Sequence, residues 1–156
     1  MQDPKRIGTC ACGEVRALIH GDPLMRVHCH CTTCQAFNDA PSADVTVFDA
    51  RDIVIEGESN IAFKAYQKNS PVLRGRCTRC QSAVIEKASM PLLPNLIMMP
   101  SEVIQPAPDI QSSQHIFYHR RTADADDQLP KRTGLVSSQG HFMKSLLAAL
   151  WRRKRA

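Results

Sequence analysis

The chain has 156 residues, enough for one domain with an apolar core, and its composition is that of a globular protein with few aromatic side chains. The formal net charge is +5, but the four basic residues at 152–155 supply most of it. The rest of the chain is nearly neutral, which argues against a nucleic-acid-binding surface across the domain body. Contact with an anionic partner is expected only from the basic tail.

The first residues contain no apolar segment of the kind found in signal peptides, and no apolar run reaches the roughly 18 residues of a membrane span. We therefore expect a cytoplasmic protein. Thiols stay reduced in the cytoplasm, so clustered cysteines there more often bind metal than form disulfides. The odd number of cysteines, seven, also argues against a complete disulfide framework.

From the N-terminus onward, alternating apolar and polar residues predict a series of short β-strands. In chain order we expect them at residues 14–21, 25–29, 43–49, 52–56, 61–67, 72–77, 82–87, 95–99 and 115–118. Short strands at this spacing are typical of a sandwich, a barrel or a folded sheet. The sequence therefore predicts a mainly β protein.

One convincing helix is predicted, at residues 140–155, after a polar stretch at 119–140 that we interpret as a loop or an extended arm. Ser137 or Ser138 is expected to cap its start. Its apolar face is formed by Phe142, Leu146, Ala149 and Leu150. We interpret it as a docking helix with a solvated basic end, and the alternative is an anchor to a membrane surface or an anionic partner.

The seven cysteines fall into three groups, which are Cys10-x-Cys12, Cys29-x-Cys31-x-x-Cys34 and Cys77-x-x-Cys80. Residues i and i+2 of an extended strand point the same way, and a Cys-x-x-Cys turn curls around an ion, so each group aims its sulfurs at one point. Thiolate sulfur favours zinc, or iron, over magnesium and calcium. Seven unrelated buried thiols are a poor explanation of such clustering.

The cysteines divide most naturally into four and three. Cys29, Cys31 and Cys34 (hereafter the triplet) are close enough in sequence to hold one ion with an open position, whereas Cys10, Cys12, Cys77 and Cys80 would close a tetrahedral site. Closed zinc sites are typically structural and open sites are typically reactive. Two other divisions remain open: the first pair could combine with two cysteines of the triplet, or Cys34 could join the last pair.

The polar residues next to the cysteines have weaker signals. His28 and His30 flank Cys29 and are expected to point away from a metal, and His115 is expected to be structural. Arg74 and Arg76 alternate onto one face just before Cys77 and could bind a ligand carboxylate, although a solvated strand edge is the simpler interpretation.

Taken together, five segments match a known pattern in order: residues 8–15 around the first cysteine pair, 29–35 with Ala40-Pro41 after them, 74–82, 115–117, and 127–130. They resemble the motifs of the glutathione-dependent formaldehyde-activating enzymes, a family that also contains centromere protein V. The resemblance covers about residues 7–130. It departs from the family pattern at Gln81, where glycine is common, and in 119–127, which lacks a tryptophan.

The resemblance implies a β-tent type zinc-binding fold of short antiparallel strands at 7–130, followed by a C-terminal extension with the basic helix at 131–156. It also implies two zinc ions per chain, one structural at Cys10, Cys12, Cys77 and Cys80 and one open at the triplet. The activity it implies joins glutathione to formaldehyde and is classed as a carbon–sulfur lyase acting in reverse.

Three thiolates would leave a bound Zn²⁺ with a net charge of −1, a poor Lewis acid for activating water. We therefore expect the triplet to be catalytic by holding an incoming thiol as the thiolate that attacks an aldehyde carbon. Arg74 or Arg76 would orient a carboxylate of glutathione.

Two other classes of function compete with this one. In a non-catalytic zinc module, a histidine or a partner would complete the triplet. A zinc-ribbon nucleic-acid binder is disfavoured by the neutral body and the few aromatic residues. The sequence leaves open whether the chain forms a homo-oligomer.

Overall fold

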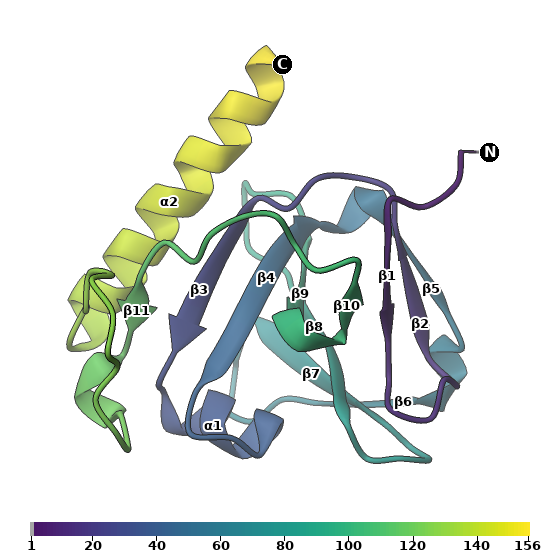
Figure 1. Cartoon of the computed structure of the whole chain (residues 1–156), viewed down its shortest axis with the longest axis horizontal. Helices are drawn as coiled ribbons and strands as arrows, with labels where there is room; N and C mark the ends of the chain where they lie inside the picture. Colours follow the sequence, from purple (N-terminus) through teal and green to yellow (C-terminus); the bar gives the residue numbers. More distant parts are fainter. Residues whose placement is uncertain (1) are drawn as a thin grey trace.

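The computed structural model describes residues 2–156 and contains two β-sheets and a long C-terminal helix (Figure 1). The smaller sheet has the order β10 (Ile104–Gln105), β1 (Arg6–Thr9), β2 (Arg16–Ile19) and β5 (Ile53–Glu56). The larger sheet has the order β11 (His115–Ile116), β3 (Met25–Cys29), β4 (Ala43–Asp49), β9 (Leu96–Pro100), β8 (Ala83–Ala88), β7 (Val72–Cys77) and β6 (Ile61–Lys64). The expected mainly β fold is confirmed.

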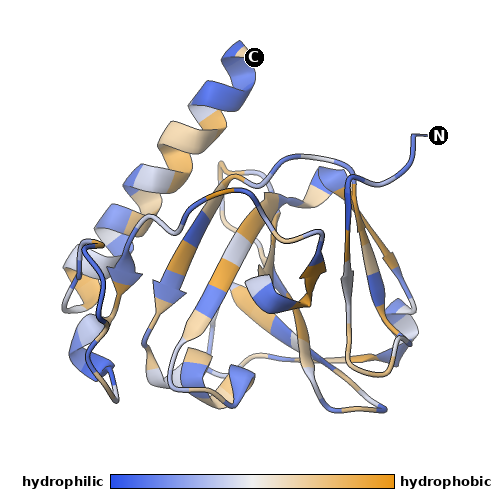
Figure 2. Cartoon of the chain, in the orientation of Figure 1, coloured by the Kyte–Doolittle hydropathy of each residue, from blue (hydrophilic) through white to orange (hydrophobic). Residues whose placement is uncertain are grey.

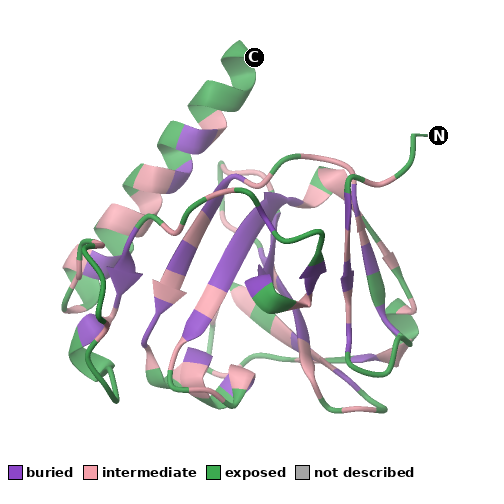
Figure 3. Ribbon diagram, in the orientation of Figure 1, coloured by how far each residue is buried: buried purple, intermediate pink, exposed green. Residues whose placement is uncertain are grey.

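Both faces of the larger sheet are covered, and each face has its own apolar core. Along β9, Leu96 and Met98 pack into one core while Ile97 and Met99 pack into the other, as alternation along a strand requires. The strand β4, next to β9, is buried along nearly its whole length because its side chains enter both cores (Figure 3). One core lies against the smaller sheet, and the other lies against the C-terminal helix.

The register is antiparallel throughout both sheets, except that β11 runs parallel to β3. Apolar and polar residues alternate along many of the strands (Figure 2), and this alternation is why sequence periodicity located them. The strands β3, β4 and β7 have the bounds expected for them. The last expected strand is shorter, because Phe117 adopts a left-handed backbone (φ 54) and a 3₁₀ turn, Tyr118–Arg120, follows.

Besides short 3₁₀ turns, the strands β1 and β10 and the short helix α1 (Thr32–Asn38) were not expected. The helix lies inside the triplet motif, and Cys31 caps it, its sulfur accepting a hydrogen bond from the Cys34 backbone N–H. It ends at Asp39, which adopts a left-handed conformation (φ 51). A seven-residue helix that contains one of the metal-type cysteines gives almost no periodic signal.

The C-terminal helix α2 (Leu135–Arg155) begins five residues before the expected start. The expected cap at Ser137 or Ser138 is wrong, because both residues lie within the helix, whose N-cap is Gly134. Ser138 is fully buried, and its hydroxyl accepts a hydrogen bond from the Phe117 N–H at 2.8 Å. The expected apolar face is confirmed, since Leu146 and Ala149 are buried in the core beneath α2.

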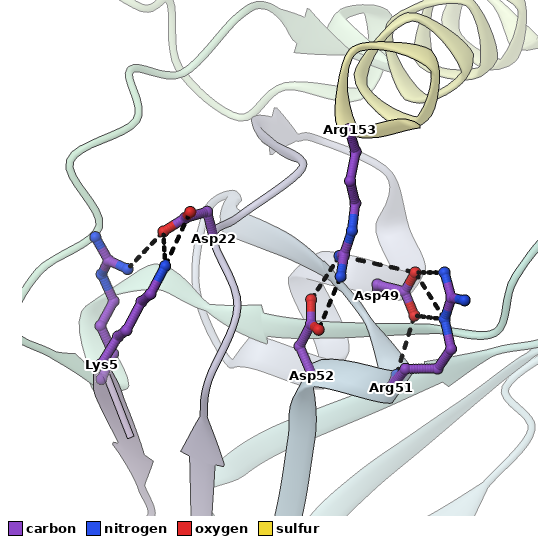
Figure 4. Close-up of polar contacts among 7 residues, drawn as sticks. Lys5, Asp22, Asp49, Arg51, Asp52 and Arg153 are labelled. Atoms are coloured by element: carbon purple, nitrogen blue, oxygen red, sulfur yellow. Dashed lines mark hydrogen bonds and ion pairs between the residues drawn. The ribbon is translucent and has the colours of Figure 1, made fainter. Parts of the chain in front are cut away.

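The basic end of α2 is only partly solvated. Arg153 reaches the body of the protein, where its guanidinium lies 2.5 and 2.8 Å from the two carboxylate oxygens of Asp52 (Figure 4). Asp49, whose side chain is fully buried, lies 3.8 Å from the same guanidinium and accepts further hydrogen bonds from Arg51. The expected solvated end is therefore corrected at Arg153, which is an ion-paired docking residue.

Within residues 2–156, none of the helices has the length and apolar character needed to cross a lipid bilayer.

Candidate metal centre

Cys10, Cys12, Cys77 and Cys80 form the four-cysteine cluster, in which the sulfur atoms lie within 4.8 Å of one another. The first pair follows β1 of the smaller sheet, and the second spans the end of β7 and the turn into β8 of the larger sheet. The sulfur of Cys12 is 3.5 Å from that of Cys10 and 3.7 Å from that of Cys77. Sulfurs bound to zinc at about 2.3 Å are about 3.8 Å apart in a tetrahedron, so the cluster fits this metal.

Two left-handed backbone positions shape the loops of this cluster. Gly13 (φ 83) closes the first turn, and its N–H donates to the Cys10 carbonyl at 3.1 Å. Gln81 (φ 61) closes the second, and its N–H donates to the Cys77 carbonyl at 2.9 Å. This backbone angle favours glycine, which gives a physical reason why glycine is common in the family at the position of Gln81.

The triplet gathers at one end of β3. Cys29 ends that strand, Cys31 caps α1, and Cys34 lies in its first turn, so that the three sulfurs lie within 4.8 Å of one another. Among residues 2–156, no fourth cysteine, histidine or carboxylate belongs to this group. Three soft ligands with an open position suit a zinc ion that also binds a substrate.

Within the triplet, the surroundings favour a thiolate at Cys31. Hydrogen bonds from the thiols of Cys29 and Cys34 lower the pKa of Cys31, and the backbone N–H of Cys34 adds a further bond at 3.3 Å. The same interaction with Cys31 raises the pKa of Cys29 well above its usual value. This set of atoms already stabilises negative charge, as a metal-binding site requires.

A cavity of about 290 Å³ adjoins the triplet. Its floor is apolar and comes from the core of the larger sheet: Val27, Val45, Leu96, Met98 and Ile116. One wall is contributed by α2, through Leu135, Gln139, Phe142 and Met143. A reactive position on the triplet would therefore face a recessed, mostly apolar space.

The two arginines singled out in the sequence have different surroundings. Arg74 lines the cavity, where its Nε lies 2.9 Å from Glu86 and its Nη2 lies 3.8 Å from the sulfur of Cys34. Arg76 does not line it. Its guanidinium donates to the carbonyls of Ala36 and Phe37 at the end of α1, at 3.0 and 2.5 Å. The geometry thus leaves Arg74 as the one of the two that a ligand can reach.

The histidines next to the triplet point away from it, into a chain of polar groups that is buried at His30 and His115. His30 Nε2 lies 2.8 Å from His115 Nδ1, and His115 Nε2 lies 2.8 Å from a carboxylate oxygen of Asp127. His28 stacks on His115 with ring centroids 4.9 Å apart. Burial, with a smaller effect of His115, lowers the pKa of His30 to about 4, so this ring is neutral near pH 7. These hydrogen-bonded side chains connect the end of β3 to β11 beside the triplet.

Sequence reasoning missed Glu86 and the cavity wall from α2. Glu86 lines the cavity together with Ala88, whereas Val84 and Ile85 pack in the other core. A carboxylate within a largely apolar strand was therefore the available signal. Burial raises its pKa to about 7, and Arg74 only partly opposes that shift. The helical wall had no such signal, because nothing in the sequence states which surface α2 covers.

The fold and the two cysteine groups define a class: a mainly β protein with one closed and one open cluster of metal-type thiols, the open one beside a cavity. The model of one family, described as glutathione-dependent formaldehyde-activating enzyme, matches residues 5–120. The chain belongs to this family, and residues 121–156 lie outside the match.

The other comparisons are more distant. A crystal structure of a Rhodobacter sphaeroides protein is similar, with a TM-score of 0.52 and 16% sequence identity, over 66% of this chain and 91% of that one. At this identity the likeness concerns the fold alone. None of the curated proteins compared with the sequence is significantly similar to it.

Proposed function

We propose that the protein is a zinc-dependent enzyme that forms or breaks the carbon–sulfur bond between a thiol and a small aldehyde, in the manner of an S-hydroxymethylglutathione synthase. One observation carries this proposal: the triplet presents three sulfurs, without a fourth side-chain ligand among residues 2–156, beside a mostly apolar cavity. A purely structural site would be expected to be saturated by the protein itself.

In this proposal the four-cysteine cluster holds a structural zinc ion and the triplet holds the second. The zinc at the triplet would supply one effect, a lowered pKa for a thiol that binds there. The reaction adds the thiol across the aldehyde: the sulfur–carbon bond forms, and the thiol proton ends on the former carbonyl oxygen. No oxidant or reductant is needed.

The side chains around the triplet have separate tasks in this reaction. The apolar floor excludes water, which keeps a bound thiolate reactive. Arg74 donates toward the sulfur of Cys34, which places its guanidinium beside a thiolate that binds at the triplet. Glu86 lines the cavity with a pKa of about 7, so its carboxylate is suited to accept the thiol proton and return it to oxygen.

Calorimetry on the zinc-loaded chain tests the proposal. We expect reduced glutathione, the thiol in the family's description, and 2-mercaptoethanol to release heat on binding the wild type but not Cys31→Ala. If glutathione alone fails to bind, another thiol is the substrate. If neither of these thiols nor an apolar thiol binds, the catalytic proposal is wrong and the triplet is part of a non-catalytic zinc module.

A further inference from the structure

The cavity beside the triplet has a polarity that restricts what can fill it. Its floor consists of buried aliphatic and methionine side chains, and the α2 wall adds Phe142 and Met143. Apart from Arg74 and Glu86, the polar residues that line it, such as Thr33, Gln67 and Gln139, are uncharged and lie where the chain is partly or fully exposed. The cavity therefore grades from an uncharged polar rim to an apolar interior.

The lining offers no free charge to an ionic ligand. Of the described residues that line the cavity, Arg74 and Glu86 are the only members with basic or carboxyl side chains, and they form an ion pair with each other. A ligand carboxylate or ammonium group drawn into this space would lose its hydration without gaining an unpaired counter-charge. Glutathione carries two carboxylates and one ammonium, so most of its length suits solvent better than this interior.

We infer that the thiol, or thiol adduct, that occupies this site has an apolar carbon skeleton, and that α2 selects it. This inference rests on the proposed function, because it assumes that a thiol reaches the triplet. The sulfur end would approach Cys29, Cys31 and Cys34, while an aliphatic or aromatic group would pack against the floor and Phe142. The bond changes are those of the proposed reaction: the new carbon–sulfur bond forms and the proton moves to oxygen.

The selecting wall belongs to the part of the chain outside the family match. Leu135, Gln139, Phe142 and Met143 all follow residue 120, where that match ends. They are held in place by the buried Leu146 and Ala149 one and two turns further along the same helix. Substrate choice in this protein is thereby separated from the cysteine motifs that it shares with its family.

Two thiols of contrasting polarity test this inference on the zinc-loaded full-length chain: phenylmethanethiol and 2-mercaptoethanol. By calorimetry we expect phenylmethanethiol to bind about 10- to 100-fold more tightly, the factor for burying one aromatic group. Glutathione is expected to bind more weakly than phenylmethanethiol. Phe142→Ala should lower the affinity for phenylmethanethiol about tenfold and leave that for 2-mercaptoethanol within about twofold.

Leu150→Ala is the matched control, because Leu150 is also half-buried against the same core but does not line the cavity. It should change neither affinity. If Phe142→Ala does not fold, Leu135→Asp replaces it: Leu135 is 64% exposed, and an acidic residue suits the first turn of a helix. That carboxylate at the cavity should weaken phenylmethanethiol binding several-fold.

The outcomes separate this inference from the proposed function. Equal affinity for the two thiols, or equal loss in Phe142→Ala and Leu150→Ala, overturns the apolar-substrate inference and leaves the catalytic proposal standing. Binding of neither thiol by the zinc-loaded wild type overturns both.

Discussion

Arg74 Nε lies 2.9 Å from Glu86 Oε2 across neighbouring strands β7 and β8, and both side chains are almost completely buried. The pair forms the polar part of the cavity wall, and the same arginine reaches the sulfur of Cys34. Burial raises the pKa of Glu86 to about 7 in spite of Arg74. The ionised pair is therefore retained at a cost in stability, as is common where a charged group has a function.

Arg74→Met should destabilise the protein in a pH-dependent way. Without its partner, ionised Glu86 is a buried unpaired charge, and breaking such pairs costs about 3–5 kcal/mol. The folded-state pKa of Glu86 is raised above its ordinary value of 4.5, so its contribution to stability is fully present below that pH and is lost as the pH rises through 7. Urea unfolding should show a large loss at pH 8 and a smaller one at pH 5. The double variant Arg74→Met/Glu86→Leu should remove this pH dependence, and its persistence would contradict the assignment to Glu86.

Arg76→Met should lower stability without changing thiol binding. The guanidinium donates to the carbonyls of Ala36, Phe37 and Gln81, and it is these acceptors that would lose their partner. A loss of about 2–3 kcal/mol in the free energy of unfolding is expected. Thiol affinity measured by calorimetry should stay within about twofold of the wild type, because Arg76 does not line the cavity. A strong loss of affinity would return this residue to the ligand site.

Metal content should distinguish the two cysteine groups. We expect two zinc ions per chain in the wild type, measured by elemental analysis. Cys31→Ala should retain one ion and remain folded by circular dichroism. Cys77→Ser should not fold stably, because the four-cysteine cluster joins the two sheets and its metal-binding energy is folding energy. One ion per wild-type chain would show that the triplet is not a metal site.

Asp49→Asn should lower the free energy of unfolding above about pH 4. Hydrogen bonds from Arg51, with a smaller contribution from Arg153, hold the pKa of Asp49 below its ordinary value of 3.8. The ionised Asp49 carboxylate should therefore contribute about 1–2 kcal/mol to the free energy of unfolding. This contribution should be present above pH 3.8 and disappear as the pH falls below it. The difference in urea stability between wild type and variant measures this. Asp22→Asn is the control, since Asp22 is 74% exposed in the other ion-pair group of Figure 4 and should contribute little.

Gln81→Gly should stabilise the protein slightly. A side chain at a left-handed position costs about 1–2 kcal/mol, and the greater freedom of glycine in the unfolded chain offsets part of that gain. A rise of about 0.5–1 kcal/mol in the free energy of unfolding is expected. Gln81→Ala removes the same side-chain hydrogen bond to Thr78 but keeps Cβ, so it should give no rise. Equal effects of the two variants would rule out the backbone explanation.

The sequence by itself determined the mainly β class, the positions of most strands and the grouping of the cysteines. These features are local. A strand can be recognised from the alternation of its apolar and polar residues, and a Cys-x-x-Cys turn brings its two sulfurs together regardless of the rest of the fold. The apolar face of α2 could also be predicted, because Leu146 and Ala149 repeat at helical spacing. Short elements such as α1 and β10 could not be predicted, because they contain too few residues for a periodic pattern to show.

Only the tertiary structure decided which cysteines meet and what they face. Cys10 and Cys77 are far apart in the chain and come together because β1 and β7 belong to sheets that pack on a shared core. The same holds for Glu86 beside Arg74, for Arg153 beside Asp52, and for the wall that α2 gives to the cavity. Such contacts form because many apolar side chains that are distant in the sequence are buried together. A local pattern of residues therefore cannot predict them.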